Sequence, residues 1–212
     1  NYIECLGREP DDSEYSFRHQ IIQQTVYKTI LSSNRRILHK NIAAIIEAIY
    51  AGQIKQWCLE LAEHYYLAEI TDKAEQYLWQ GLKLARQLCM NSKALECCER
   101  LISLSSQARI PSLRLIQASI YLDMGNYARA EKLLKALKPD EMENPADRDL
   151  FVLAKTRLSM ATEELHATLE YLSLALPTLQ DPEAQSSAII YLLDIKRQLN
   201  PPDFLTLAQS LA

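Results

Sequence analysis

The chain has 212 residues, of which 48% are hydrophobic and 24% charged, and its formal net charge is −4. This balance is ordinary for a globular protein with enough chain to bury a core, and the charge excludes a strong overall attraction to nucleic acid or acidic lipid. No apolar run reaches the ~20 residues that cross a bilayer, and the acidic residues among the first twenty exclude a signal peptide.

The first seventeen residues are predicted to form two short strands. Ile3 and Cys5 precede the turn-rich stretch GREPDD, and Tyr15 and Phe17 follow it, which is typical of a β-hairpin. A lone hairpin is marginally stable in water, so we expect it to dock on helices or on a part outside this chain. Because residue 1 is Asn rather than Met, we expect the chain to be a piece of a longer protein.

The rest of the chain has the periodicity of helices. One stripe, at i, i+4, i+7 and i+11, consists of Leu38, Ile42, Ile45 and Ile49. Asn144 and Asp181 each precede a proline, the pattern of a capping residue before the first helical position. Helices are predicted at 18–32, 34–50, 55–70, 72–89, 92–106, 112–124, 126–138, 146–160, 163–177, 183–199 and 202–211. The short connections favour antiparallel neighbours.

Cysteine and histidine positions give no pattern of a metal site. The five cysteines include no C-x-x-C pair, so reduced, partly buried thiols are expected. The four histidines are far apart in sequence, and we interpret each as a packing or surface residue. An acid–base pair could be written for Glu63 with His64, or for Glu14 with His19. No nucleophile motif or glycine-rich loop accompanies either pair, so neither is expected to be catalytic. We therefore expect no catalytic residue, no cofactor and no metal in this chain.

Two segments share the spacing of the tetratricopeptide repeat, with nine residues from a tyrosine to an alanine. The matching residues are Cys58, Leu61, Ala62, Tyr65, Ala74, Leu78 and Gly81 in the first copy, and Ala118, Tyr121, Gly125, Ala130 and Leu134 in the second. A weaker third copy has Leu158, Ala167 and Tyr171. Small residues let paired helices approach closely, whereas Arg114 and Gln117 stand where the pattern has large apolar residues.

A single helix hairpin cannot bury its own apolar face, so hairpins stack into a solenoid. We therefore predict an all-α fold: a tetratricopeptide-like right-handed superhelix of antiparallel helix hairpins, with a short N-terminal β-hairpin. The repeat positions that face the groove of such a superhelix are predicted to bind a partner. They are Gln56, Leu59, Glu63, Tyr66 and Leu67 in the first copy, and Ser112, Leu115, Ser119 and Leu122 in the second. The open alternative is that these side chains pack on a neighbouring helix or face water.

Residues 15–105 carry a further set of motifs. An aromatic-Phe-Arg-His stretch begins at Tyr15 and is followed by Tyr27. An arginine-bearing turn (Arg35 and Arg36) leads to the pair Leu38-His39, and LAEHY (Leu61 to Tyr65) and KAEQYLWQGLKLA (Lys73 to Ala85) follow. In order and spacing this segment resembles multidomain signalling ATPases, including class III adenylate or guanylate cyclases with an ATPase region and ATP-dependent transcription regulators.

The resemblance implies that residues 1–50 are the last part of a winged-helix-like domain, a hairpin plus two helices, and that residues 51–212 are the tetratricopeptide-like α-solenoid. It implies a noncatalytic, regulatory protein-interaction module of a cytoplasmic signalling protein. No Walker or cyclase motif is present, so either activity would lie upstream.

Two other functions stay open. One is a stand-alone tetratricopeptide adaptor. The other is a DNA-associated segment, suggested by a basic cluster comprising Lys28, Arg35, Arg36, His39 and Lys40. That cluster lacks an aromatic stacking platform, and phosphate contacts alone bind weakly. We therefore expect a protein partner rather than nucleic acid or a membrane.

Overall fold

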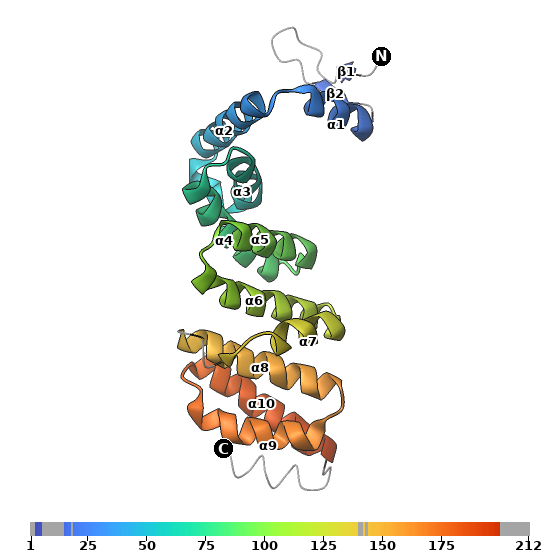
Figure 1. Cartoon of the computed structure of the whole chain (residues 1–212), viewed down its shortest axis with the longest axis vertical. Helices are drawn as coiled ribbons and strands as arrows, with labels where there is room; N and C mark the ends of the chain where they lie inside the picture. Colours follow the sequence, from blue (N-terminus) through green and yellow to red (C-terminus); the bar gives the residue numbers. More distant parts are fainter. Residues whose placement is uncertain (1–2, 6–14, 18, 140–141, 143, 200–212) are drawn as a thin grey trace. The chain divides into compact units, whose positions relative to one another are not determined.

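The structure is a computed structural model that describes residues 3–5, 15–17, 19–139, 142 and 144–199 (Figure 1). The described part is built from helices, which confirms the all-α class. The α-helices are α1 (Gln20–Thr29), α2 (Ser32–Ile49), α3 (Cys58–Leu67), α4 (Thr71–Gln87), α5 (Asn91–Leu104), α6 (Ile110–Asp123), α7 (Tyr127–Lys135), α8 (Pro145–Ala161), α9 (Leu165–Ala175) and α10 (Pro182–Leu199). The short 3-10 helices include η1 (Ala51–Trp57), η2 (Gln107–Arg109) and η4 (Leu176–Thr178).

These α-helices match the predicted ranges to within a few residues, and the predicted helix at 202–211 lies outside the described residues. Two strands precede them: β1 (Ile3–Cys5) pairs antiparallel with β2 (Tyr15–Phe17). The turn predicted to join the strands lies outside the described residues. From residue 19 to residue 199, the described chain contains no strand, so no sheet interrupts the helices there.

Four tight turns of one kind connect successive helices. Their left-handed residues are Glu69, Cys89, Gly125 and Glu163, with φ of 57°, 55°, 69° and 62°. In each turn two backbone N–H groups bond back to the preceding helix; at Gly125 these bonds run to Leu122 O (3.0 Å) and, from the next residue, to Tyr121 O (2.8 Å). This is the Schellman ending, and at Gly125 the glycine predicted for a left-handed turn has that role.

A small buried residue follows each turn by five positions, and a second buried residue follows four positions later. The first set is Ala74, Ala94, Ala130 and Thr168, and the second is Leu78, Cys98, Leu134 and Leu172. Ala62 and Ala118, the two alanines predicted on the preceding helices, are also buried.

The third copy shows where the predicted spacing is wrong. Ala167, the predicted contact residue, is exposed, and the neighbouring Thr168 is buried. The reason is the turn: Glu163 follows Leu158 by five residues, whereas Gly125 follows Tyr121 by four. The small-residue position therefore moves by one along α9.

The chain divides into two compact units, residues 1–77 and 78–212, and the boundary falls within α4. In the first unit α2 packs on α3. Glu47 of α2 accepts hydrogen bonds from Lys73 Nζ (2.6 Å) and Tyr77 Oη (2.7 Å), and Lys73 also donates to Tyr65 Oη (2.9 Å). These bonds hold α2 to the helices that follow it. The predicted division into domains at residue 50 stays a prediction.

Described residues of the second unit form the following two apolar clusters. One joins α6, α7 and α8 through buried residues that include Leu115, Ala118, Ala130 and Phe151. The other joins α8, α9 and α10, which lie side by side in Figure 1. The buried Asp149 accepts hydrogen bonds from the backbone N–H groups of Gln180 (2.9 Å) and Asp181 (2.8 Å), which fixes the loop before α10.

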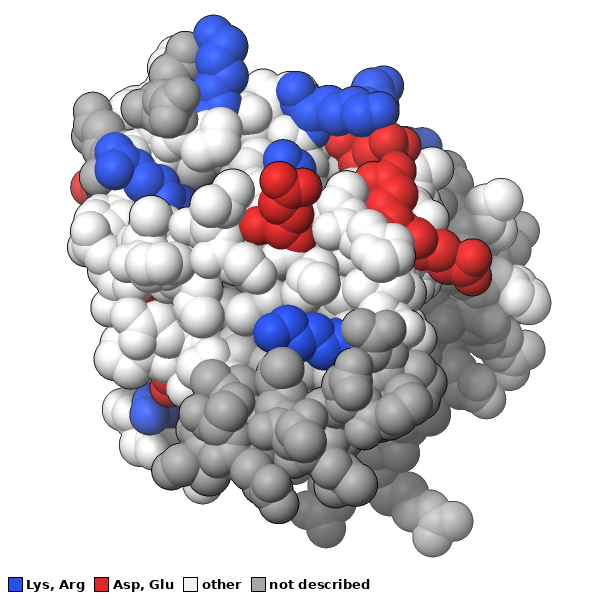
Figure 2. All heavy atoms as spheres, turned by 90° about the horizontal axis from the view of Figure 1, so that it is seen from below, with Lys and Arg blue, Asp and Glu red and all other residues white. Residues whose placement is uncertain are grey.

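The predicted helix caps at Asn144 and Asp181 are confirmed. Asn144 Oδ1 accepts from Ala146 N–H at 3.1 Å, and Asp181 Oδ2 accepts from Ala184 N–H at 3.2 Å. In the described part of the face drawn in Figure 2, lysine and arginine side chains and acidic side chains are interspersed among uncharged residues. Within the described ranges no helix combines the length and apolarity that a bilayer crossing requires.

Candidate functional site

The structure divides the nine predicted groove residues into two groups. In the first copy, Gln56 is exposed, while Leu59, Glu63, Tyr66 and Leu67 are half-buried. These five line a face of η1 and α3 in the first unit, and their role in binding stays a prediction.

The second-copy residues are in contact with α8 or buried, which corrects the predicted open groove. Leu115 and Leu122 are buried in the α6–α7–α8 cluster, and Ser119, also buried, donates to Leu115 O at 3.2 Å. Ser112 is half-buried and donates to Asp147 Oδ2 of α8. The physical reason is that α8 packs on this face of α6, so the alternative of packing on a neighbouring helix holds at these positions.

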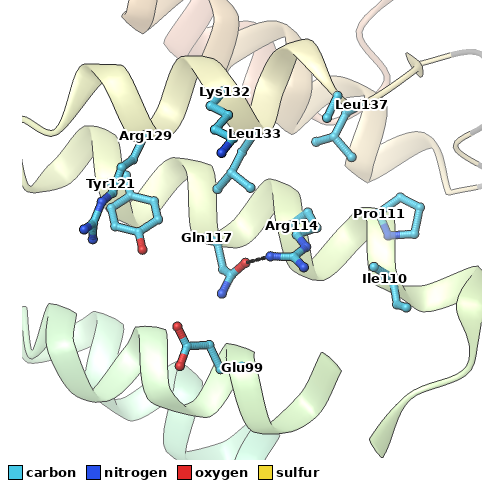
Figure 3. A pocket seen from close by; sticks show the side chains of 11 residues that line it. Glu99, Ile110, Pro111, Arg114, Gln117, Tyr121, Arg129, Lys132, Leu133 and Leu137 are labelled. Atoms are coloured by element: carbon cyan, nitrogen blue, oxygen red, sulfur yellow. Dashed lines mark hydrogen bonds between the residues drawn. The ribbon is translucent and has the colours of Figure 1, made fainter. Parts of the chain in front are cut away.

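A different face of α6 is open. A groove of about 640 Å³ lies between α5, α6 and α7, and Figure 3 shows the side chains that line it. Ile110, Pro111 and Leu137 gather at one end of the groove, and Leu133 projects into it from α7. This volume is within the range of pockets that hold drug-sized ligands. These apolar side chains suit a ligand that has apolar groups.

Three cations also line the groove. Arg114 extends from α6, and Arg129 and Lys132 extend from α7 (Figure 3). Arg114 Nη1 donates to Gln117 Oε1 at 3.2 Å, and the Arg129 guanidinium lies 5.5 Å from the centre of the Tyr121 ring. Among the described residues none of the three forms an ion pair.

The remaining charge in the lining is the Glu99 carboxylate, which extends from α5. The groove therefore has an excess of positive charge although the chain is acidic overall. Its lining contains no serine, cysteine or histidine, and the arrangement is suited to holding a ligand with anionic groups. We name this site the α5–α7 groove.

Sequence reasoning missed the α5–α7 groove. Arg114 and Gln117 were noticed as departures from the repeat pattern, and both line the groove. The sequence offers one indication of the groove: at these two positions it has polar residues where the repeat normally has apolar ones. Arg129 and Lys132 could not be assigned to the same site, because their approach to α6 depends on how α6 and α7 pack.

A second polar cluster lies in the first unit. Tyr27 Oη is 2.7 Å from His39 Nε2, and His39 Nδ1 is 2.8 Å from His64 Nδ1. Burial holds the pKa of both histidines below the ordinary value, and the neighbouring His64 lowers that of His39 further. One imidazole of the pair must donate its N–H while the other accepts it, so a doubly protonated pair loses this contact.

The basic cluster of α1 and α2 is largely engaged within the protein. Arg36 pairs with Glu69 at 3.0 Å, and the Arg35 guanidinium lies 5.1 Å from the centre of the Tyr27 ring. His39 belongs to the histidine pair. Only Lys28 and Lys40 of the cluster form no contact of this kind with a described residue, which leaves few free charges for a phosphate backbone.

Cys58, Cys89, Cys97 and Cys98 are thiols outside any disulfide; Cys89 is exposed and the other three are buried. Burial raises the pKa of Cys98 to about 12 and also raises that of Cys58. No group of three or more potential metal ligands occurs among the residues that the structure describes.

Comparisons with models of protein families, with curated proteins and with solved structures found no match to this chain. The resemblance of residues 15–105 to signalling ATPases therefore stays an expectation that rests on the motifs themselves.

Proposed function

We propose that this chain is a noncatalytic protein-binding module whose α5–α7 groove takes an acidic segment of a partner protein. The observation that carries the proposal is the set of three cations, Arg114, Arg129 and Lys132, which lie around an apolar groove and form no ion pair with a described carboxylate. Charged groups at a binding surface favour partners of opposite sign.

A protein segment suits this groove better than a compact small molecule. The cations are spread along α6 and α7, while the apolar residues Ile110, Pro111 and Leu137 gather at one end (Figure 3). A ligand that uses both regions presents several carboxylates followed by an apolar side chain. A peptide segment supplies both in one chain, and its backbone can follow the groove.

The fold that presents the groove is proposed to be a tetratricopeptide-like superhelix. Four turns of one geometry, each followed at fixed intervals by two buried residues, support a repeating unit. The burial of Ala62, Ala74, Ala118 and Ala130 supports the predicted close contacts between helices.

We further propose that the module belongs to a cytoplasmic signalling protein with an upstream ATPase or nucleotide cyclase, as the motifs of residues 15–105 imply. The test is the full-length sequence: a phosphate-binding glycine-rich loop upstream of residue 1 is expected. Its absence leaves the stand-alone adaptor as the better description.

Binding by the groove is tested with two labelled peptides of equal length that share an apolar end and carry either glutamates or lysines. Fluorescence anisotropy is expected to show binding of the acidic peptide alone, weaker at high salt. Lys132→Ala should weaken it about tenfold, the loss expected for a charge-assisted contact. Lys135→Ala, an exposed change on the same helix outside the groove, is the matched control. Equal binding of both peptides, or equal effects of both variants, would contradict the proposal.

A further inference from the structure

The α5–α7 groove carries opposite charges on its two sides. Arg129 and Lys132 extend from α7 on one side of Gln117. Glu99 extends from α5 on the other side (Figure 3). Helix α6, which carries Gln117, packs on both α5 and α7 and so forms the middle of the groove. A ligand that carries carboxylates alone would therefore complement only the α7 side.

The Glu99 carboxylate is available to a ligand. Its side chain is exposed and forms no ion pair with a described residue. Glu96, on the same helix, is by contrast paired with Lys93 (3.0 Å) and Arg100 (2.7 Å). An unpaired carboxylate attracts a cation and repels an anion. Glu99 can therefore select the charge of a ligand group on the α5 side of the groove.

The side chain of Gln117 determines the polarity at the centre of the groove. It is only 3% exposed, and its Oε1 accepts a hydrogen bond from Arg114 Nη1 at 3.2 Å. Because a guanidinium only donates, the amide must turn its oxygen toward Arg114 and its NH₂ group away. In Figure 3 the amide nitrogen lies on the side of Glu99. No described residue accepts from this nitrogen, so it can donate to a carbonyl oxygen of a bound peptide.

These groups together define a ligand with two differently charged edges. Its carboxylates would face Arg129 and Lys132, and its cations would face Glu99. An extended peptide has this property when acidic and basic residues alternate, because successive side chains point to opposite sides of the backbone. A purely acidic segment would place like charges beside Glu99, which weakens binding.

We propose that the α5–α7 groove selects an extended partner segment in which acidic and basic residues alternate, with the basic side chains toward Glu99. This inference rests on the proposed function and adds that Glu99 determines which acidic segments are accepted. An apolar residue at one end of the segment contacts Ile110, Pro111 and Leu137.

The test uses the whole chain and three labelled peptides of equal length that share an apolar end. The first alternates glutamate and lysine, the second has the same composition with all glutamates before all lysines, and the third carries glutamate alone. Since the first two have the same net charge, a difference between them reports the order of the charges. Fluorescence anisotropy is expected to show about threefold tighter binding of the alternating peptide than of the block peptide, as for an exposed ion pair.

The variant Glu99→Gln separates an effect of charge from an effect on folding. It should weaken binding of the alternating peptide and strengthen binding of the all-glutamate peptide, each about threefold, because one carboxylate attracts the first and repels the second. A damaged fold would weaken both, and circular dichroism verifies that the variant remains folded. The matched control Glu170→Gln removes an exposed carboxylate from α9, outside the groove, and should change neither.

The outcomes distinguish this inference from the function on which it rests. If the all-glutamate peptide binds, but the alternating and block peptides bind equally and Glu99→Gln has no effect, the inference is wrong and the proposed function stands. If none of the three peptides binds, both are wrong. A dimer of the chain alone in sedimentation velocity that Lys132→Ala dissociates and Lys135→Ala does not would assign the groove to a second copy and also refute the inference.

Discussion

Replacing Ala130 by leucine tests the close contact between α6 and α7. Ala130 is fully buried in the cluster that includes Leu115 and Ala118. The two helices are joined by the tight turn at Gly125, and Asn126 caps α7 through a hydrogen bond from Arg129 N–H at 3.3 Å. Separating the helices would disturb this turn, so the extra carbons of leucine have no free space. We expect a loss of about 1–3 kcal/mol in the free energy of unfolding, the usual range for overpacking.

The assay is chemical denaturation followed by circular dichroism, with separate fits if the two compact units unfold separately. Ala128→Leu is the matched control, because Ala128 is exposed on the same helix and the chemical change is identical. It is expected to change the free energy of unfolding by no more than about 0.5 kcal/mol. If both variants have equal, small effects, Ala130 is not a helix contact and the packing described for α6 and α7 is wrong.

Three further predictions concern other parts of the chain. Thr168→Leu should destabilise the second unit by about 1–3 kcal/mol, whereas Ala167→Leu should not, and thermal melting can compare the two variants. If Ala167→Leu were the more destabilising variant, the register predicted from the sequence would be right. Because the pKa values of His39 and His64 are lowered in the folded state, unfolding takes up protons, and the free energy of unfolding should fall as pH drops below about 6.5. Urea titrations at several pH values should show that this free energy depends less on pH in His64→Gln. An unchanged dependence on pH would contradict the histidine contact. In a Cys5→Ser background, a thiol reagent at mildly alkaline pH should label Cys89 quickly and the buried cysteines only after unfolding, as mass spectrometry of the labelled chain can show.

Helix positions could be predicted from the sequence because local features determine them. Asn144 and Asp181 are followed by prolines and cap the helices that begin there. Gly125 forms the left-handed turn expected of it. Such features need no knowledge of distant residues, which explains why the predicted and observed helices agree closely.

The turns at Glu69, Cys89 and Glu163 could not be predicted in the same way. A left-handed residue without a glycine leaves no clear mark in the sequence, and the position of Glu163 shifts the contact residue from Ala167 to Thr168. The nine-residue interval therefore identifies the buried small residue in the first two copies, Ala74 and Ala130. In the third copy it points to Ala167, one residue before the buried Thr168.

Which side of a helix is buried was harder to predict than the helix itself. Leu115 and Leu122 have the spacing of groove residues, but α8 covers them. On α2 the regular apolar stripe remains exposed, while Ala43 is buried against the neighbouring helix. Periodicity identifies a face with common chemistry, but only the arrangement of the other helices decides whether that face is in the core.

The histidine pair is part of a contact among three helices. Tyr27, His39 and His64 come from α1, α2 and α3, and each belongs to a different motif in the sequence, yet they form one chain of hydrogen bonds. The side chains of α2 therefore differ in environment: His39 is buried and connects α2 to α1 and α3, whereas Ile45 is exposed.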